Sequence, residues 1–222
     1  MPKTKLACYN TIMKIAKLEH SGILIEKDGS LLVFDPVEFA KKIPKLNNVV
    51  AVVITHRHSD HFQPEVLEKI VGDNSEAKIL TTSEVGALVE NSIVVKAGDH
   101  YEIGGFNLDF FGKDHSAIVP GQIPCENIGV VVDENIVNPG DSFDLPSTNA
   151  KVLFVPTAAP WLKMSESMDF IKRAAPELVV PIHDALLSEL GETISNNWVM
   201  KACDEMGAKF VYLKPGDNIE LG

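Results

Sequence analysis

The sequence predicts an α/β fold in which two similar halves, each with its own β-sheet, pack as a sandwich with helices outside. The 222 residues, 45% of them apolar, suit a single domain over residues 1–222 with a sizeable core. In each half, short β-type runs come first, and strands then alternate with helical segments. The segments 96–104 (KAGDHYEIG) and 214–222 (KPGDNIELG) resemble each other. This likeness indicates an internal duplication with its break between His100 and His115.

The elements of the first half follow from local patterns. The continuous β-branched run 49–55 (VVAVVIT) suits a strand that is buried on both faces. A helix is expected at 64–71, which starts with proline, and another at 83–90, which starts with a serine cap. The remaining strands are expected at 12–18, 22–26, 30–34, 77–81 and 106–111, with a Lys-Asp-Gly turn before the third.

The second half repeats this order with different boundaries. A helix at 164–175 should end before Pro176, and another at 195–206 should stop at Gly207. Strands are expected at 128–132, 151–155, 178–182 and 209–213, with a turn at 133–135 after the first of them. The pattern again predicts a β-meander that is followed by alternating strands and helices.

Charge and composition exclude several classes of protein. The 20 basic and 31 acidic residues leave a formal net charge of −11, which opposes general nucleic-acid binding. No apolar run approaches the roughly 20 residues of a membrane span, and no secretory signal is visible. Cys8, Cys125 and Cys203 are odd in number and far apart, which is typical of reduced thiols. We therefore expect a cytoplasmic protein that acts on a small molecule, and a homo-oligomer is compatible with the sequence.

The strongest chemical signal is the polar run 55–61 (THRHSDH), which follows the expected buried strand 49–55. In an extended loop, residues two apart point the same way, so His56 and His58 can hold one metal ion. Asp60 and His61 come where the chain turns toward a helix, and they suit a second ion beside the first. Two imidazoles on one ion favour zinc, manganese or iron over calcium.

Further metal-binding residues must come from distant positions, because the ligands of this run do not complete two sites. His115 follows the expected strand 106–111, and His183 follows the expected strand 178–182. Asp141 lies in a Gly-Asp turn after another strand. Strand ends are the usual place for site residues in α/β folds.

The four motifs THRHSDH, GKDHS, PGDSF and PIHD, in this order, resemble those of the metallo-β-lactamase superfamily. The resemblance covers nearly the whole chain and implies a four-layer αββα sandwich with pseudo-duplicated halves and a binuclear site at its edge. It implies that one metal is held by His56, His58 and His115, a second by Asp60, His61 and His183, and that Asp141 bridges both.

Segments 18–26, 32–36, 126–129 and 156–161 are similar to one branch of that superfamily. This branch contains the L-ascorbate-6-phosphate lactonase, the N-acyl-phosphatidylethanolamine phospholipase and small bacterial metal-dependent hydrolases.

The resemblance implies a hydrolase that uses a metal-bridging hydroxide to cleave a small ester, lactone or phosphodiester. Two divalent ions are expected, zinc first, with manganese or iron as alternatives. Asp60 would orient the hydroxide and take up its proton. The metals leave the site slightly positive, so the substrate can be anionic. Two other functions stay open, namely an iron-dependent oxidoreductase similar to persulfide dioxygenases and a metal-binding protein without catalysis.

Other polar and aromatic residues have two interpretations each. His20 and Trp161 are candidates for substrate binding, although both could instead pack in the core. Cys125 follows His115 in a loop that could approach the site, or it is an inert buried thiol. Asp184 could orient a metal-binding imidazole, or it is a solvated loop carboxylate. His100 lies in a Gly-Asp turn and is expected at the surface.

Overall fold

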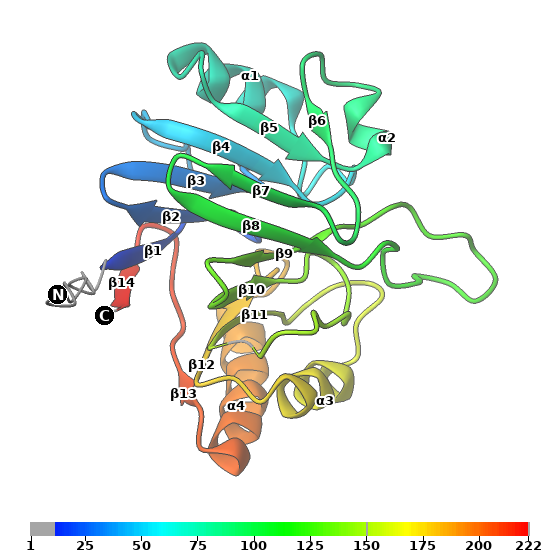
Figure 1. Cartoon of the computed structure of the whole chain (residues 1–222). Coiled ribbons are helices and arrows are strands. Elements are labelled where there is room, and N and C mark those ends of the chain that lie inside the picture. Colours follow the sequence, from blue (N-terminus) through cyan, green and yellow to red (C-terminus); the bar gives the residue numbers. More distant parts are fainter. Residues whose placement is uncertain (1–11, 150, 222) are drawn as a thin grey trace, which may run out of the picture.

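Two seven-stranded sheets face each other in the computed structural model, which describes residues 12–149 and 151–221, and helices cover their outer faces (Figure 1). Cys8 lies outside the described residues. The largest buried cluster, with Phe34, Phe106 and Phe154 among its members, belongs to both sheets and fills the space between them. One further buried cluster lies between the first sheet and its helices, and another lies between the second sheet and its helices. The predicted four-layer αββα sandwich is therefore confirmed.

The first sheet has the strand order β14-β1-β2-β3-β4-β5-β6. β14, β1, β2 and β3 pair antiparallel, and β3 to β6 pair parallel. Helix α1 connects β4 to β5, and the short helix α2 connects β5 to β6. The bounds are β1 Met13–Lys17, β2 Ile23–Lys27, β3 Ser30–Phe34, β4 Val49–Ile54, α1 Pro64–Asp73, β5 Lys78–Thr81, α2 Ser83–Gly86, β6 Ile93–Val94 and β14 Asn218–Leu221.

The second sheet repeats this arrangement in the order β7-β8-β9-β10-β11-β12-β13. Its first four strands again pair antiparallel and the rest parallel. Helices α3 and α4 take the places of α1 and α2. The bounds are β7 His100–Ile103, β8 Phe106–Phe111, β9 Gly129–Val132, β10 Ile136–Asn138, β11 Val152–Pro156, α3 Met164–Ala174, β12 Leu178–Ile182, α4 Glu189–Met206 and β13 Lys209–Phe210.

The predicted duplication is confirmed by this topology. Its break falls between β7 and β8. The last strand of each half, β7 or β14, belongs to the sheet of the other half. The two Lys-x-Gly-Asp segments therefore occupy matching places before an edge strand. In both, the lysine N–H is bonded to the aspartate carboxylate, at 3.0 Å in Lys96–Asp99 and 3.0 Å in Lys214–Asp217.

Several boundaries differ from the prediction. Helix α4 begins at Glu189 and not at residue 195, because Ser188 caps it by accepting a hydrogen bond from the Gly191 N–H. Helix α2 ends at Gly86 rather than residue 90, and the strand expected at 209–213 is only two residues long. The short strand expected before Asp141 is β10, whereas three strands were not predicted, namely β6, β7 and β14. Each is at most four residues long, and β7 and β14 alternate between exposed and half-buried residues at sheet edges.

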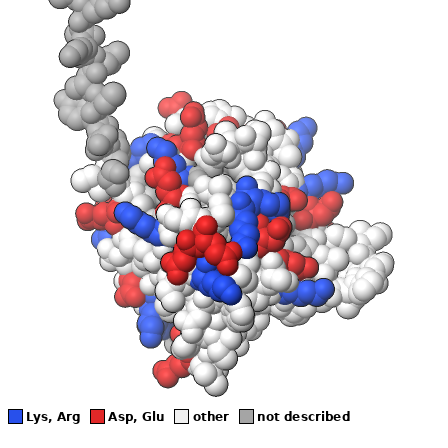
Figure 2. Space-filling model, turned by 90° about the horizontal axis from the view of Figure 1, so that it is seen from below, with Lys and Arg blue, Asp and Glu red and all other residues white. Residues whose placement is uncertain are grey.

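Charged side chains are mixed on the face that Figure 2 shows. Acidic and basic residues lie beside one another there, and the basic ones form no continuous patch. None of the helices in the described part of the chain combines the length and hydropathy that a bilayer span requires.

A buried ion pair joins the two sheets next to the loops that follow β1 and β12. The Lys17 ammonium at the end of β1 lies 3.2 Å from the Asp184 carboxylate and 3.4 Å from the Pro181 carbonyl oxygen. The two side chains are 0% and 9% exposed. Burial lowers the pKa of Lys17, and Asp184 opposes this shift. Because neither charge is hydrated, each depends on the other for compensation.

We expect Lys17→Ala to lower the free energy of unfolding by about 3–5 kcal/mol, because it leaves the Asp184 charge buried without its partner. Urea denaturation measures this change. The matched control is Lys42→Ala, because Lys42 is 85% exposed in its pair with Glu38 and should contribute little. Equal stability of the two variants would contradict a structural role for the buried pair.

Candidate metal centre

Seven side chains from four loops meet where the parallel strands end. The loop after β4 carries His56, His58, Asp60 and His61, and its turn is closed by the N–H groups of His61 and Phe62, which donate to the His58 carbonyl. His115 follows β8, Asp141 follows β10, and His183 directly follows β12 (Figure 1). The structure thus brings together all seven residues that the sequence singled out as metal-binding candidates.

The Asp141 carboxylate lies at the centre of this group. Its Oδ1 is 3.2 Å from His61 Nε2, and its Oδ2 is 3.0 Å from His183 Nε2 and 3.3 Å from His115 Nε2. His56 Nε2 lies 4.0 Å from Oδ2. One buried carboxylate thus faces four imidazoles from three different loops.

The donor atoms fall into two neighbouring groups. In one, donor atoms of His56, His58 and His115 lie within 4.8 Å of one another. In the other, donor atoms of Asp60, His61, His183 and His20 do so. Asp141 forms a third set with His56 and His61, one from each group. The His and Asp donor atoms therefore form neighbouring candidate metal-binding clusters, and Asp141 belongs to the set that links them.

The outer nitrogens of four imidazoles are held by hydrogen bonds. Nδ1 of His115 faces the Ser116 carbonyl, and Nδ1 of His183 faces the Ala158 carbonyl. A carbonyl oxygen only accepts, so both Nδ1 atoms carry the proton. His61 Nδ1 lies 2.8 Å from Asp35 Oδ2, and His56 Nδ1 lies 3.0 Å from the Thr55 hydroxyl. This pattern directs the lone pairs of the four Nε2 atoms inward, as metal-binding histidines require.

These inward atoms fit a metal ion. Among the described residues, Nε2 of His56, His61, His115 and His183 and Oδ1 of Asp141 are buried and make no well-formed hydrogen bond. Donor atoms that face one another at 3.0–3.3 Å are stabilised by a shared cation, or by a proton on His61, because burial lowers the pKa of His61 but the Asp141 and Asp35 carboxylates outweigh this and raise it. Nitrogen and carboxylate donors together suit zinc, manganese or iron.

The burial of these side chains and the charges beside them give protonation states that suit metal ligands. Burial lowers the pKa of His56 and His58, so both imidazoles are neutral near pH 7. Burial alone would raise the pKa of Asp141, but His61 and His183 hold it well below its usual range. Burial of Asp60 likewise opposes ionisation and is outweighed by His20 and His61, which lower its pKa. Both carboxylates are therefore ionised.

Three residues that support the site were not predicted to do so. Asp35, at the end of β3, accepts hydrogen bonds from the Thr55 N–H and hydroxyl, both at 2.7 Å, besides contacting His61. Asn127 accepts the Asp141 N–H at 2.9 Å. Gly140 has a φ of +61°, and a Cβ there would lie 2.3 Å from Asn127 Oδ1. The Asp-Pro that ends β3 was the available signal for Asp35.

The remaining candidates take specific places around the site. The Trp161 indole N–H donates to Asp141 Oδ2 at 2.9 Å, and its ring is buried against Phe143. Cys125 approaches the site, with its Sγ 3.7 Å from His58 Nε2. Asp184 neither orients an imidazole nor stands in solvent, because it pairs with Lys17. His100 is exposed beside Asp109, as expected.

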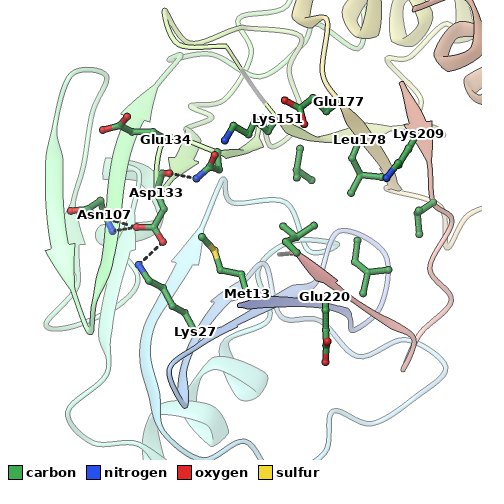
Figure 3. A pocket seen from close by; sticks show the side chains of 15 residues that line it. Met13, Lys27, Asn107, Asp133, Glu134, Lys151, Glu177, Leu178, Lys209 and Glu220 are labelled. Atoms are coloured by element: carbon green, nitrogen blue, oxygen red, sulfur yellow. Dashed lines mark hydrogen bonds and ion pairs between the residues drawn. The ribbon is translucent and has the colours of Figure 1, made fainter. Parts of the chain in front are cut away.

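A separate cavity lies away from the histidines. It measures about 760 Å³ and is lined by the starts of β1, β12 and β13, at the opposite end of these strands from the histidines (Figure 3). Lys27 on its wall is already bonded to Asp133 at 2.7 Å. The histidines of the candidate metal centre are therefore at the other end of the sandwich from this cavity.

The duplicated αββα sandwich and its buried His/Asp cluster together define a metal-binding protein of the α/β class. The chain belongs to the β-lactamase superfamily, because the model of the β-lactamase superfamily domain matches residues 14–183.

Among curated proteins, Protein Rv0786c of Mycobacterium tuberculosis is 31% identical over 182 residues, which cover 79% of this chain and 86% of that protein. Two solved structures share the fold. Igni18, a metallo hydrolase of Ignicoccus hospitalis, is 20% identical with a TM-score of 0.74, over 96% of this chain and 99% of its own. The isothiocyanate hydrolase from Delia radicum gut bacteria is 15% identical with a TM-score of 0.67, over 93% and 98%. The likeness to the lactonase and phospholipase branch stays a prediction.

Proposed function

We propose that the protein is a metal-dependent hydrolase that works with two divalent ions. One observation carries the proposal: a buried carboxylate, Asp141, faces imidazole Nε2 atoms from three loops, and these atoms have no other well-formed hydrogen bond among the described residues. Membership of the β-lactamase superfamily supports it, as does the likeness to proteins that are named metallo hydrolases. Zinc is the first choice of metal, with manganese and iron as alternatives.

The proposed ligands follow the two groups of donor atoms. His56, His58 and His115 would hold the first ion, and Asp60, His61 and His183 the second, with Asp141 shared between them. Trp161 supports this by fixing one oxygen of Asp141 through its indole N–H. Asp35 fixes His61 in the orientation that turns Nε2 inward.

When bound, the two ions would supply a water of lowered pKa and a Lewis acid for the oxygen that gains negative charge. Asp60 would act on that water as the proton acceptor. Its side chain is 32% exposed, whereas that of Asp141 is 3% exposed. Asp60 is therefore the one ionised carboxylate of the group that both solvent and substrate can reach, and Asp141 is left to hold the ions.

The surroundings favour a carbonyl substrate with an apolar substituent, such as an ester or lactone. Phe39, Ile118 and Leu186 are exposed, and each lies in a loop that carries or contacts a histidine of the site. Arg57 and Lys113 are the cations nearest in the chain to the proposed ligands. Arg57 is paired with Glu84, and Lys113 is exposed. The metals would supply most of the positive charge that a phosphodiester or another anionic substrate meets in the site.

We expect chelation to abolish hydrolysis, and zinc or manganese to restore it, because the ions supply the reacting water and the Lewis acid. The measurement is metal content beside turnover of a panel of esters, lactones, thioesters and phosphodiesters. Undiminished hydrolysis by metal-free protein would overturn the proposal. If the isolated protein contains iron and takes up oxygen in a sulfur-dependent reaction, the protein is instead an oxidoreductase.

A further inference from the structure

His20 shares the buried space of the candidate ligands without belonging to the set of seven. It follows β1, is 1% exposed, and its ring centroid lies 3.9 Å from that of His183. Its Nε2 is 3.4 Å from Asp60 Oδ2 and, like the inward nitrogens of the candidate ligands, makes no well-formed hydrogen bond among the described residues. By distance alone, His20 could therefore be a further ligand of the second ion.

The hydrogen bond on the other ring nitrogen argues against a ligand role. The Ala185 N–H points at His20 Nδ1 at 3.2 Å. An N–H group only donates, so Nδ1 must present its lone pair. In a neutral imidazole the proton is then on Nε2, which has no lone pair for a cation.

The duplication supplies an internal comparison. His115 follows β8 as His20 follows β1, and β8 and β1 are equivalent strands of the two halves. His115 Nδ1 faces the Ser116 carbonyl, whereas His20 Nδ1 faces the Ala185 N–H. Equivalent positions thus carry opposite tautomers. One directs a lone pair into the site, and the other directs an N–H into it.

We propose that His20 is a positioning residue that presents its Nε2–H to the Asp60 carboxylate, and that it is not a metal ligand. Through this contact His20 would restrain Asp60 Oδ2, the oxygen that also lies 3.5 Å from His183 Nε2, and so would hold the carboxylate in place for its role at the metal site. The backbone reinforces the arrangement, because the His183 N–H donates to the His20 carbonyl at 3.2 Å. The loop 183–185 therefore carries a candidate ligand and also sets the tautomer of His20. The effect on catalysis rests on the proposed function, whereas the tautomer does not.

Long-range ¹H–¹⁵N NMR of the imidazoles tests the tautomer directly, in metal-free and zinc-loaded protein. We expect His20 to be protonated on Nε2, and His115 and His183 on Nδ1. The His20→Gln variant assigns the His20 signals by their loss. Protonation of His20 on Nδ1 in either state would overturn the proposal. The result does not depend on turnover, so it fails or succeeds separately from the hydrolase assignment.

Two substitutions then separate positioning from ligation. His20→Ala and His20→Gln should both bind as many zinc ions per chain as the wild type. In His20→Ala, kcat should fall roughly 10–100-fold with little change in KM, as is usual when a group that orients a metal-site residue is removed. His20→Gln can place an N–H near the Nε2 position and should recover part of that loss.

The reference for a ligand is His183→Ala, which should lose zinc, and the surface control is His100→Ala, which should change little. Loss of zinc from His20→Ala comparable to that from His183→Ala would identify His20 as a ligand. If His20→Ala binds as much zinc as the wild type and its kcat is unchanged, His20 has no positioning role. If His20→Ala does not fold, His20→Gln and the NMR measurement decide.

Discussion

Asp141→Ala is expected to bind fewer metal ions and to lose hydrolytic activity by a factor of about 10³ or more. The carboxylate faces four imidazoles at 3.0–4.0 Å, with Oδ1 beside His61 and Oδ2 beside the other three. Several kcal/mol of transition-state stabilisation depend on the ions that it would hold, which corresponds to at least this factor in rate. The measurement is zinc per chain by elemental analysis beside kcat/KM on one ester or lactone.

Trp161→Phe is the matched control for this variant. It keeps the Asp141 carboxylate and most of the aromatic packing but removes the indole N–H that donates at 2.9 Å. We expect a milder loss, about 10-fold. Asp141→Ala with wild-type zinc content and more than a tenth of the activity would show that Asp141 does not hold the ions.

Asp60→Asn is expected to lower kcat by roughly 10²–10⁴, the usual contribution of a positioned acid or base. Asparagine keeps the shape and one acceptor oxygen but loses the charge and the capacity to take a proton. The fold and at least one ion should be retained, because His56, His58, His115 and Asp141 are untouched. Zinc content and kcat are measured together, with His100→Ala as the surface control. Near-wild-type turnover with intact metal would require a base other than Asp60.

The core of the fold could be predicted because its strands carry their own signal. β4 and β11 are continuous apolar runs whose residues are almost all buried, so pattern alone identifies them. β7 and β14 could not be recognised in this way. Their side chains alternate between exposed and half-buried positions. β14 is a strand because β1, at the other end of the chain, supplies its backbone partner, whereas β7 pairs with β8, which directly follows it in the sequence. Backbone pairing, rather than local propensity, makes these edge strands.

The candidate ligands were recognisable for a similar reason. Histidine and aspartate in unusual density at strand ends are a local signal, and the order of the motifs resembles a known superfamily. The residues that orient them have at most a weak local signal, such as the Asp-Pro pair that follows β3. Asp35 lies 20 residues before Thr55, and Trp161 lies 20 residues after Asp141, so their hydrogen bonds follow from the folded sheets alone. The pairing of Lys17 with Asp184 spans the two halves and has no sequence signature.

The central claim is that two metal ions share Asp141. Anomalous diffraction from crystals of zinc-loaded protein tests it most directly. We predict two peaks about 3.5–4 Å apart, one among His56, His58 and His115 and the other among Asp60, His61 and His183, both in contact with Asp141. A single peak held by either group without Asp141, or no peak within this cluster at full zinc loading, would contradict the account.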